Sequence, residues 1–293
     1  MIEVERERRR WNMGVYLNPG NEKFAKAVQS EIYVDKTGLI EYTNQVINTV
    51  QRYVCVSRPR RFGKSMTADM LTAYYGKECD SRELFSGLKI SQNAVFAQHL
   101  NQYPTIFLNM QEFLSRSKEI GQVIDRVRRM LLRELKNSYP DVDYFDDTDL
   151  VESLQDIYAA TKQSFIIIID EWDVLIRDES ANKKVQDEYI RFLRGMFKGT
   201  EPTKYIQLAY LTGILPIKKE KTQSALNNFR EYSMLNAGCL ASYIGFTEDE
   251  VKALCETYKK DFTEVKRWYD GYQLGKYHVY NPNAVVNLMV DGN

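Results

Sequence analysis

The sequence contains few of the residues that build metal clusters or disulfide frameworks. Its 293 residues include four cysteines and two histidines, and no two cysteines have the CxxC spacing of a zinc site. This scarcity argues against a structural zinc centre and against a small secreted fold held by disulfides. We expect reduced thiols, mostly buried, at Cys55, Cys79, Cys239 and Cys255.

Long hydrophobic runs and net charge are also missing. No stretch approaches the ~18–20 consecutive apolar residues that cross a bilayer, and the amino terminus alternates charges where a signal peptide would have an apolar segment. Forty basic and forty acidic residues cancel, so composition gives no general attraction to nucleic acid or anionic membranes. We expect a cytoplasmic protein without membrane contact. Any nucleic-acid contact would have to come from a local patch.

What the sequence does contain is an alternation of short apolar runs with longer amphipathic segments. The apolar runs predict strands at 53–56, 105–108, 165–169 and 205–211. The amphipathic segments predict helices at about 64–76, 119–138, 148–162 and 184–198. This alternation is typical of an α/β fold with a parallel sheet covered by helices on both faces, which is a three-layer sandwich.

The segments on either side of this core differ from it. Residues 1–30 form a polar lead-in, and a short β-prone run at 32–35 precedes a helix expected over 36–48. We place the core at 31–215. A smaller, mostly helical subdomain or lid is expected over 216–293, truncated if the chain is a fragment, with a capping-box pattern at Thr247-Glu-Asp-Glu250.

A phosphate-binding loop is predicted where the first strand leads into a helix. The segment 57–65 reads Ser-Arg-Pro-Arg-Arg-Phe-Gly-Lys-Ser, and backbone N–H groups at a helix N-terminus point at a bound anion. Lys64 would reach the β- and γ-phosphates, and Ser65 would ligate Mg²⁺. The match to GxxxxGK[ST] is incomplete, because Arg58 occupies the position of the first glycine. The expected nucleotide-binding residues are Arg60, Arg61, Phe62, Gly63, Lys64, Ser65 and Met66.

Two carboxylates end the third predicted strand abruptly. Sheet packing does not require Asp170 and Glu171 after a run of isoleucines, whereas phosphoryl transfer uses such a pair. Asp170 would hold the metal, and Glu171 would orient and partly deprotonate the attacking water. The alternative is that both residues cap the next helix. Thr212 ends the next strand. Its hydroxyl would either sense the γ-phosphate or simply form a hydrogen bond at the end of the strand. Arg230 would be either an arginine finger or an ordinary surface charge.

Several motifs resemble the predicted AAA-ATPase-like family of bacterial proteins. They are Tyr33-Val-Asp-Lys-Thr-Gly-Leu-Ile40, the loop 57–65, Leu211-Thr-Gly-Ile-Leu-Pro-Ile217, Ser224-Ala-Leu-Asn-Asn-Phe229 and Trp268-Tyr-Asp-Gly-Tyr272. The family is similar to archaeal-type and STAND P-loop ATPases. The resemblance implies a P-loop NTPase fold, ATP and Mg²⁺ as cofactors, and a strand order that places the Thr212 strand between the loop strand and the Asp170 strand.

The resemblance also bears on activity. It gives Lys64, Glu171 and Thr212 catalytic roles, and it gives Ser65 and Asp170 the metal. Longer members carry a C-terminal PD-(D/E)XK nuclease-like domain, but no Asp…Glu-x-Lys pattern follows residue 272 here, so nuclease activity is not expected. The leading hypothesis is ATP hydrolysis that moves 216–293 against the sheet. The alternatives are a nucleotide-gated interaction module with negligible hydrolysis and a scaffold without nucleotide binding.

Overall fold

The computed structural model describes residues 13–178, 180–217 and 226–291. Its centre is a five-stranded parallel sheet with the order β2-β3-β4-β1-β5. The strands are β1 (Tyr53–Ser57), β2 (Thr105–Asn109), β3 (Phe165–Asp170), β4 (Ile206–Gly213) and β5 (Arg230–Tyr232). The four strands predicted from the sequence are confirmed, and β4 lies between β1 and β3 as the family resemblance implies. The fifth strand comes from beyond residue 215, where we expected the core to end.

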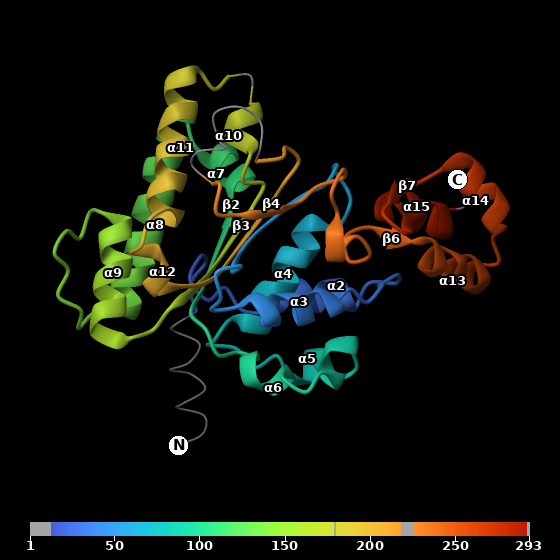
Figure 1. The fold of residues 1–293 in the computed structure, drawn as a ribbon, viewed down its shortest axis with the longest axis horizontal. Coiled ribbons are helices and arrows are strands. Elements are labelled where there is room, and N and C mark those ends of the chain that lie inside the picture. The colour runs from blue at the N-terminus through green and yellow to red at the C-terminus, as the bar shows by residue number, and fades with distance from the viewer. Residues whose placement is uncertain (1–12, 179, 218–225, 292–293) are drawn as a thin grey trace.

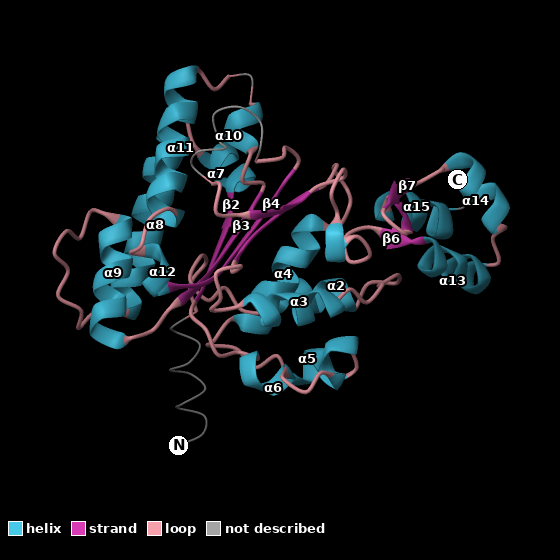
Figure 2. Ribbon diagram, in the orientation of Figure 1, coloured by secondary structure: helices cyan, strands magenta, loops and turns pink. Residues whose placement is uncertain are grey.

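Two layers of helices cover the sheet (Figures 1 and 2). One face packs against α8 (Val123–Ser138), α9 (Leu150–Thr161) and α11 (Lys183–Phe197). The other packs against α2 (Glu22–Val28), α3 (Gly38–Val46) and α4 (Lys64–Tyr75). The remaining short helices of the core are α5 (Arg82–Ser86), η1 (Lys89–Gln92), α6 (Phe96–His99), α7 (Met110–Arg116), η2 (Ile120–Gln122), α10 (Val174–Arg177), α12 (Pro202–Tyr205) and η4 (Gly238–Leu240).

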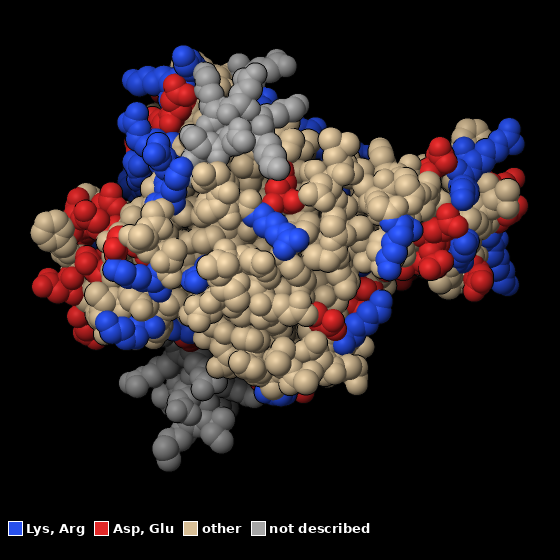
Figure 3. Space-filling model, in the orientation of Figure 1, with Lys and Arg blue, Asp and Glu red and all other residues tan. Residues whose placement is uncertain are grey.

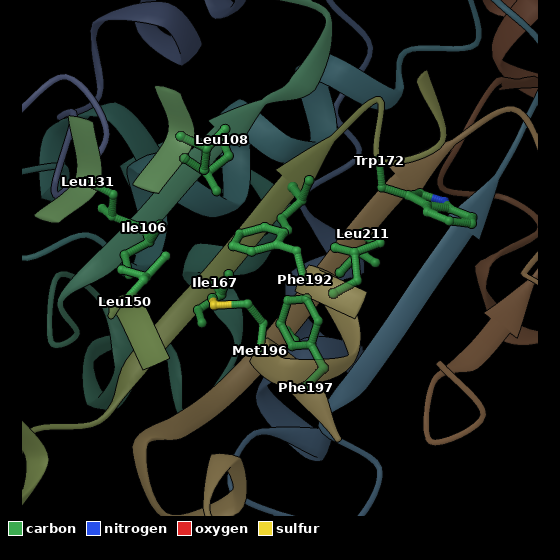
Figure 4. Close-up of a cluster of buried hydrophobic side chains, with 14 of the residues drawn as sticks. Ile106, Leu108, Leu131, Leu150, Ile167, Trp172, Phe192, Met196, Phe197 and Leu211 are labelled. Atoms are coloured by element: carbon green, nitrogen blue, oxygen red, sulfur yellow. The ribbon is translucent and has the colours of Figure 1, made fainter. Parts of the chain in front are cut away.

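The two-sided burial of the strands explains why they read as continuous apolar runs. Successive side chains point to opposite faces, so Ile167 and Ile169 of β3 enter one hydrophobic cluster while Ile166 and Ile168 enter the other. Figure 4 shows the first cluster, where Ile167 lies among side chains of the neighbouring strands and helices. Burying each such side chain contributes about 1.5–3 kcal/mol. A polar residue at these positions would therefore be costly on either face.

The carboxyl-terminal part forms a smaller unit beside the sheet, at the right of Figure 1. Its elements are β6 (Phe246–Thr247), α13 (Glu248–Tyr258), α14 (Phe262–Trp268), β7 (Tyr272–Leu274), β8 (Tyr277–Tyr280) and α15 (Pro282–Asp291). The unit has three helices among its described elements, and it also contains an antiparallel sheet ordered β6-β8-β7 that the sequence did not predict. The capping box is present: Thr247 Oγ1 accepts from the Glu250 N–H, and Glu250 accepts from the Thr247 N–H.

The segment before α3 packs on this unit instead of forming a strand. Ile32 and Val34 contact the hydrophobic cluster of α13, β8 and α15, and the strand expected at 32–35 is absent from the described residues. The Asp35 carboxylate instead accepts hydrogen bonds from the backbone N–H groups of Thr37 (2.8 Å) and Lys89 (2.7 Å). The segment 32–48, which we call the preface, therefore contacts both parts of the chain.

The surface agrees with the balanced composition. Side chains of both signs are interspersed over the two ends of the face shown in Figure 3. None of the described helices is long and apolar enough to span a bilayer. All four cysteines are free, but only Cys55 and Cys255 are buried, whereas Cys79 is half-buried and Cys239 is exposed. Residues 1–12 of the predicted lead-in and the lysine-rich stretch at 218–225, including Ser224, lie outside the described residues.

Candidate functional site

The predicted site residues come together at one edge of the sheet. Parallel strands end at a common edge, and ligands of open α/β sheets bind there. Ser57 of β1 is paired with Gly213 of β4, and Asn109 of β2 is paired with Asp170 of β3. The four strands therefore end side by side, and we call this end of the sheet the acidic edge. The loop leading into α4 and the turn after β3 therefore face the same region. We call this turn, residues 171–173, the acidic turn.

Asp170 is held rigidly at this edge. Its side chain is fully buried; Oδ1 accepts from the Thr212 hydroxyl and from the Glu171 N–H (3.0 Å), and Oδ2 accepts from Asn109 Nδ2 (3.1 Å). No described Lys, Arg or His forms an ion pair with it. A buried carboxylate with neutral donors only is a strong candidate for binding a cation.

The phosphate loop has the backbone that anion binding needs. Arg61 and Gly63 both have positive φ, at 68° and 84°, and turns of this kind direct successive N–H groups to one side. A Cβ on Gly63 would meet no atom within 4 Å, so this glycine is required for its backbone angle and not for space. Lys64 begins α4, and its Nζ donates to the Pro59 carbonyl at 2.9 Å.

Burial and nearby carboxylates have opposite effects on the pKa of Lys64. Only 4% of the residue is exposed. Burial lowers the pKa of Lys64 from its usual value, while the carboxylates of Glu171 and Asp170 oppose this shift. The side chain therefore lies close to the acidic edge, as the hypothesis requires.

Arg58, the departure from the glycine pattern, points away from the loop into the protein. It is 1% exposed, and its Nη1 donates to the carbonyls of Ser57 and Tyr232, both at 2.9 Å. Burial lowers its pKa to about 10. Arg58 thus fastens β5 to β1, which gives the side chain a structural role that a glycine could not fill.

A cavity of about 700 Å³ opens in front of this edge, within the ~300–1,000 Å³ typical of ligand sites. The loop contributes every residue from Arg60 to Met66, the acidic turn contributes Glu171, and the carboxyl-terminal unit contributes Phe246 and Asn283. Five of the lining residues have basic side chains and one has a carboxylate: Lys36, Arg60, Arg61, Lys64, Arg177 and Glu171. The cavity is therefore suited to an anionic ligand.

Glu171 lies at the cavity wall in an uncommon backbone conformation, with φ at 54°. Its carboxylate is paired with Arg177 Nη2, and Arg177 Nε donates to Asp173 Oδ2 at 3.0 Å. The same Asp173 oxygen accepts from the N–H groups of Ile214 (3.1 Å) and Leu215 (2.7 Å). Asp173 thus anchors the acidic turn and Arg177 to the end of β4.

The structure separates the other candidate residues by their access to the cavity. Thr212 is buried and contacts Asp170, but it does not line the cavity. Arg230 also lies outside the cavity lining and is exposed, with its guanidinium 5.4 Å from the ring centre of Tyr232. The sequence analysis did not identify Asn109 or Arg177 as site residues. A usable signal existed for Asn109, because it is a polar residue at the end of an apolar strand, as Thr212 nearly is.

A metal ion could be held by few protein ligands. The described residues contain no cluster of three or more His, Cys, Asp or Glu that could bind one. Mg²⁺, however, commonly takes one or two protein oxygens and completes its shell with water and phosphate. The Asp170 carboxylate, which is buried just behind the cavity lining, and the hydroxyl of Ser65, which is a lining residue, are oxygen donors of this kind. The donor set therefore fits Mg²⁺ when a triphosphate accompanies it.

Asp69 on α4 makes the stability of this region depend on pH. Burial raises the pKa of its carboxyl to about 6; Lys23 opposes the shift, and Asp170 and Glu112 add to it. Unfolded aspartate has a pKa of ~3.9. As pH rises from about 4 to about 6, the unfolded chain loses a proton that the folded protein keeps, so this group's contribution to stability falls across that window.

Asp69→Asn is expected to remove this pH-dependent loss and to raise stability near neutral pH. Urea unfolding midpoints between pH ~4 and ~7, in buffer containing a chelator, measure the effect. Asp187→Asn alters an exposed carboxylate on α11 and should leave the pH dependence unchanged. An Asp69→Asn profile parallel to that of the wild type would contradict the assignment.

Comparison with known proteins finds similarity over most of the chain. The model of a family described as Predicted AAA-ATPase matches residues 20–222, more than half of the chain. An uncharacterized protein in the vnfD 5' region of Azotobacter chroococcum mcd 1 is 25% identical over 276 residues, which are 90% of this chain and 49% of that protein. The chain therefore spans about half the length of the curated relative it matches.

Proposed function

The chain belongs to the predicted AAA-ATPase family, and we propose that it binds ATP with Mg²⁺ in the cavity before the sheet edge and hydrolyses the β–γ phosphoanhydride. The observation that carries this proposal is the charge of the cavity, whose lining contains five basic side chains and one carboxylate. The triphosphate would lie along the loop from Arg60 to Met66. Its base would extend toward the apolar wall at Ile32, Val34 and Phe246.

Each loop and edge residue has a distinct role in binding. Lys64 would exchange the Pro59 carbonyl for the β- and γ-phosphates, and the N–H groups of the Arg61–Gly63 turn would bind phosphate oxygens. Ser65 and Asp170 would hold Mg²⁺, with Thr212 and Asn109 orienting Asp170. The chemistry that Mg²⁺ supplies when bound is neutralisation of charge on the β- and γ-phosphates. Thr212 would therefore act through Asp170 and not by contacting the γ-phosphate.

Hydrolysis would use Glu171 to align one water molecule. The water oxygen forms a bond to the γ-phosphorus, and the bond from that phosphorus to the β–γ bridging oxygen breaks. The products are ADP and inorganic phosphate, and the proton lost by the water passes through the Glu171 carboxylate to solvent. Lys64 would stabilise the negative charge that builds on the leaving ADP.

Coupling to the carboxyl-terminal unit is supported by contacts across the cavity. Lys36 lines the cavity, and its Nζ donates to Glu250 (2.5 Å) and to the Ser242 carbonyl (2.8 Å). Glu250 also caps α13. A nucleotide between these parts would favour one arrangement of the unit against the sheet. We place the reaction in the cytoplasm, where ATP is available. The partner is another protein or a second copy, and nucleic acid would be reached only indirectly.

The competing proposal is a nucleotide-gated interaction module that binds ATP and hydrolyses it negligibly. The specific observation in its favour is the pairing of Glu171 with Arg177, which occupies the carboxylate proposed to align water. Phosphate release measured under saturating ATP and Mg²⁺ separates the two. We expect multiple turnovers that stop when a chelator removes the metal. ATP binding without phosphate release would favour the module instead.

A further inference from the structure

Arg177 lies at the cavity wall between two acidic residues of the same turn. Its side chain is 18% exposed and lines the cavity together with Lys64 and Ser65. A cation in this position faces the end of the cavity where the loop and the acidic edge meet.

Arg177 contacts two carboxylates, and the protein holds one of them more firmly than the other. Asp173 is fully buried, and two backbone N–H groups fix its Oδ2, so the Nε contact at 3.0 Å holds the base of the guanidinium. Glu171 is 20% exposed and lines the cavity, and no backbone N–H group is seen to hold its carboxylate among the described contacts. The Nη2 end of the guanidinium can therefore change partner while the Nε end stays in place.

A γ-phosphate would compete directly with Glu171 for this Nη2 end. Guanidinium groups bind phosphate oxygens through paired, charge-assisted hydrogen bonds. A terminal phosphate also carries more negative charge than one carboxylate, so the exchange is electrostatically favoured. Once released from Arg177, the Glu171 carboxylate is free to accept a hydrogen bond from water.

We propose that Arg177 is a catalytic arginine supplied by the chain itself, which holds Glu171 when no γ-phosphate is bound and binds the γ-phosphate during hydrolysis. This inference rests on the proposed ATPase function and deepens it. The short helix α10 places the guanidinium, and the i,i+4 pair with Asp173 keeps it aimed at the cavity.

The test compares ADP with ADP plus aluminium fluoride, which mimics the transferring phosphoryl group. In Arg177→Ala, ADP affinity should stay within about threefold of the wild type, whereas aluminium fluoride should no longer tighten binding and turnover should fall by about 10²–10³-fold. Arg177→Lys keeps the charge without the paired donors, and we expect intermediate tightening. Arg191→Ala removes an exposed arginine of α11 outside the cavity and should behave as the wild type.

The outcomes separate this inference from the proposed function. Wild-type tightening by aluminium fluoride in both Arg177 variants would overturn the role of Arg177 while leaving the ATPase proposal intact. Faster turnover in Arg177→Ala would show a restraint on Glu171 alone and would also overturn it. If Arg177→Ala does not fold, the Arg177→Lys result decides. A wild-type protein that neither binds ADP nor hydrolyses ATP would remove both proposals.

Discussion

Glu171→Gln is expected to lower ATP turnover by about 10²–10⁴-fold, the usual contribution of a general base, while ATP affinity stays within about threefold of the wild type. Glutamine has nearly the shape of glutamate but cannot take a proton from water. The residue lies at the cavity wall and not in the phosphate loop, so binding of the triphosphate should survive. The variant should therefore trap ATP without hydrolysing it.

Single-turnover phosphate release and equilibrium binding of ATP together measure this effect. Glu83→Gln provides a matched control, because Glu83 is an exposed residue of α5 outside the cavity lining. Its turnover should equal that of the wild type. Unchanged turnover in Glu171→Gln would remove Glu171 from the mechanism, whatever the binding result.

Lys64→Ala is expected to weaken ATP binding by about 10–100-fold, which corresponds to the ~1.5–3 kcal/mol of a hydrogen bond to a charged group. Lys64 is 4% exposed, and burial lowers the pKa of its amine, so the folded protein without nucleotide gains little from its charge. The variant should unfold at nearly the wild-type temperature and should lose most of the stabilisation that ATP gives.

Thermal unfolding with increasing ATP and Mg²⁺ measures that stabilisation, because a ligand of the folded state alone must raise stability. Lys183→Ala removes an exposed lysine at the start of α11 and should keep the full ATP-dependent rise. The same rise in Lys64→Ala would place the triphosphate outside the loop.

The core strands could be predicted because burial on both faces leaves a simple pattern. β3 is buried at all six positions, and such strands read as uninterrupted apolar runs. β5 is three residues long with the exposed Arg230 at its start, and β6 to β8 are two to four residues long. Strands this short carry no measurable alternation, so only their tertiary partners define them.

The site could be predicted where chemistry and topology coincide. Lys64 and Glu171 follow different strands, and the rule for parallel sheets brings them to one edge. The role that we propose for Arg177 could not be inferred from the sequence, because it depends on where a short helix of four residues places the side chain. Its i,i+4 spacing from Asp173 is a usable signal, but the same spacing occurs on ordinary helix surfaces.

The cavity itself depends on the whole fold. Its walls join Lys36 of the preface, the loop after β1, the turn after β3 and Phe246 of the carboxyl-terminal unit. These segments are far apart in the sequence, so no local sequence pattern could predict that they come together around one cavity. The family resemblance implied the strand order of the core, and the placement of the carboxyl-terminal unit against the preface became visible only in three dimensions.

A crystal structure with a non-hydrolysable ATP analogue and Mn²⁺ in place of Mg²⁺ tests the central claim most directly, because anomalous scattering locates the metal independently of the nucleotide. We predict one manganese peak bound by Ser65 Oγ and next to the Asp170 carboxylate, with Lys64 Nζ moved from Pro59 to the terminal phosphates. A triphosphate bound elsewhere, or a manganese ion remote from both Ser65 and Asp170, would contradict the proposed site.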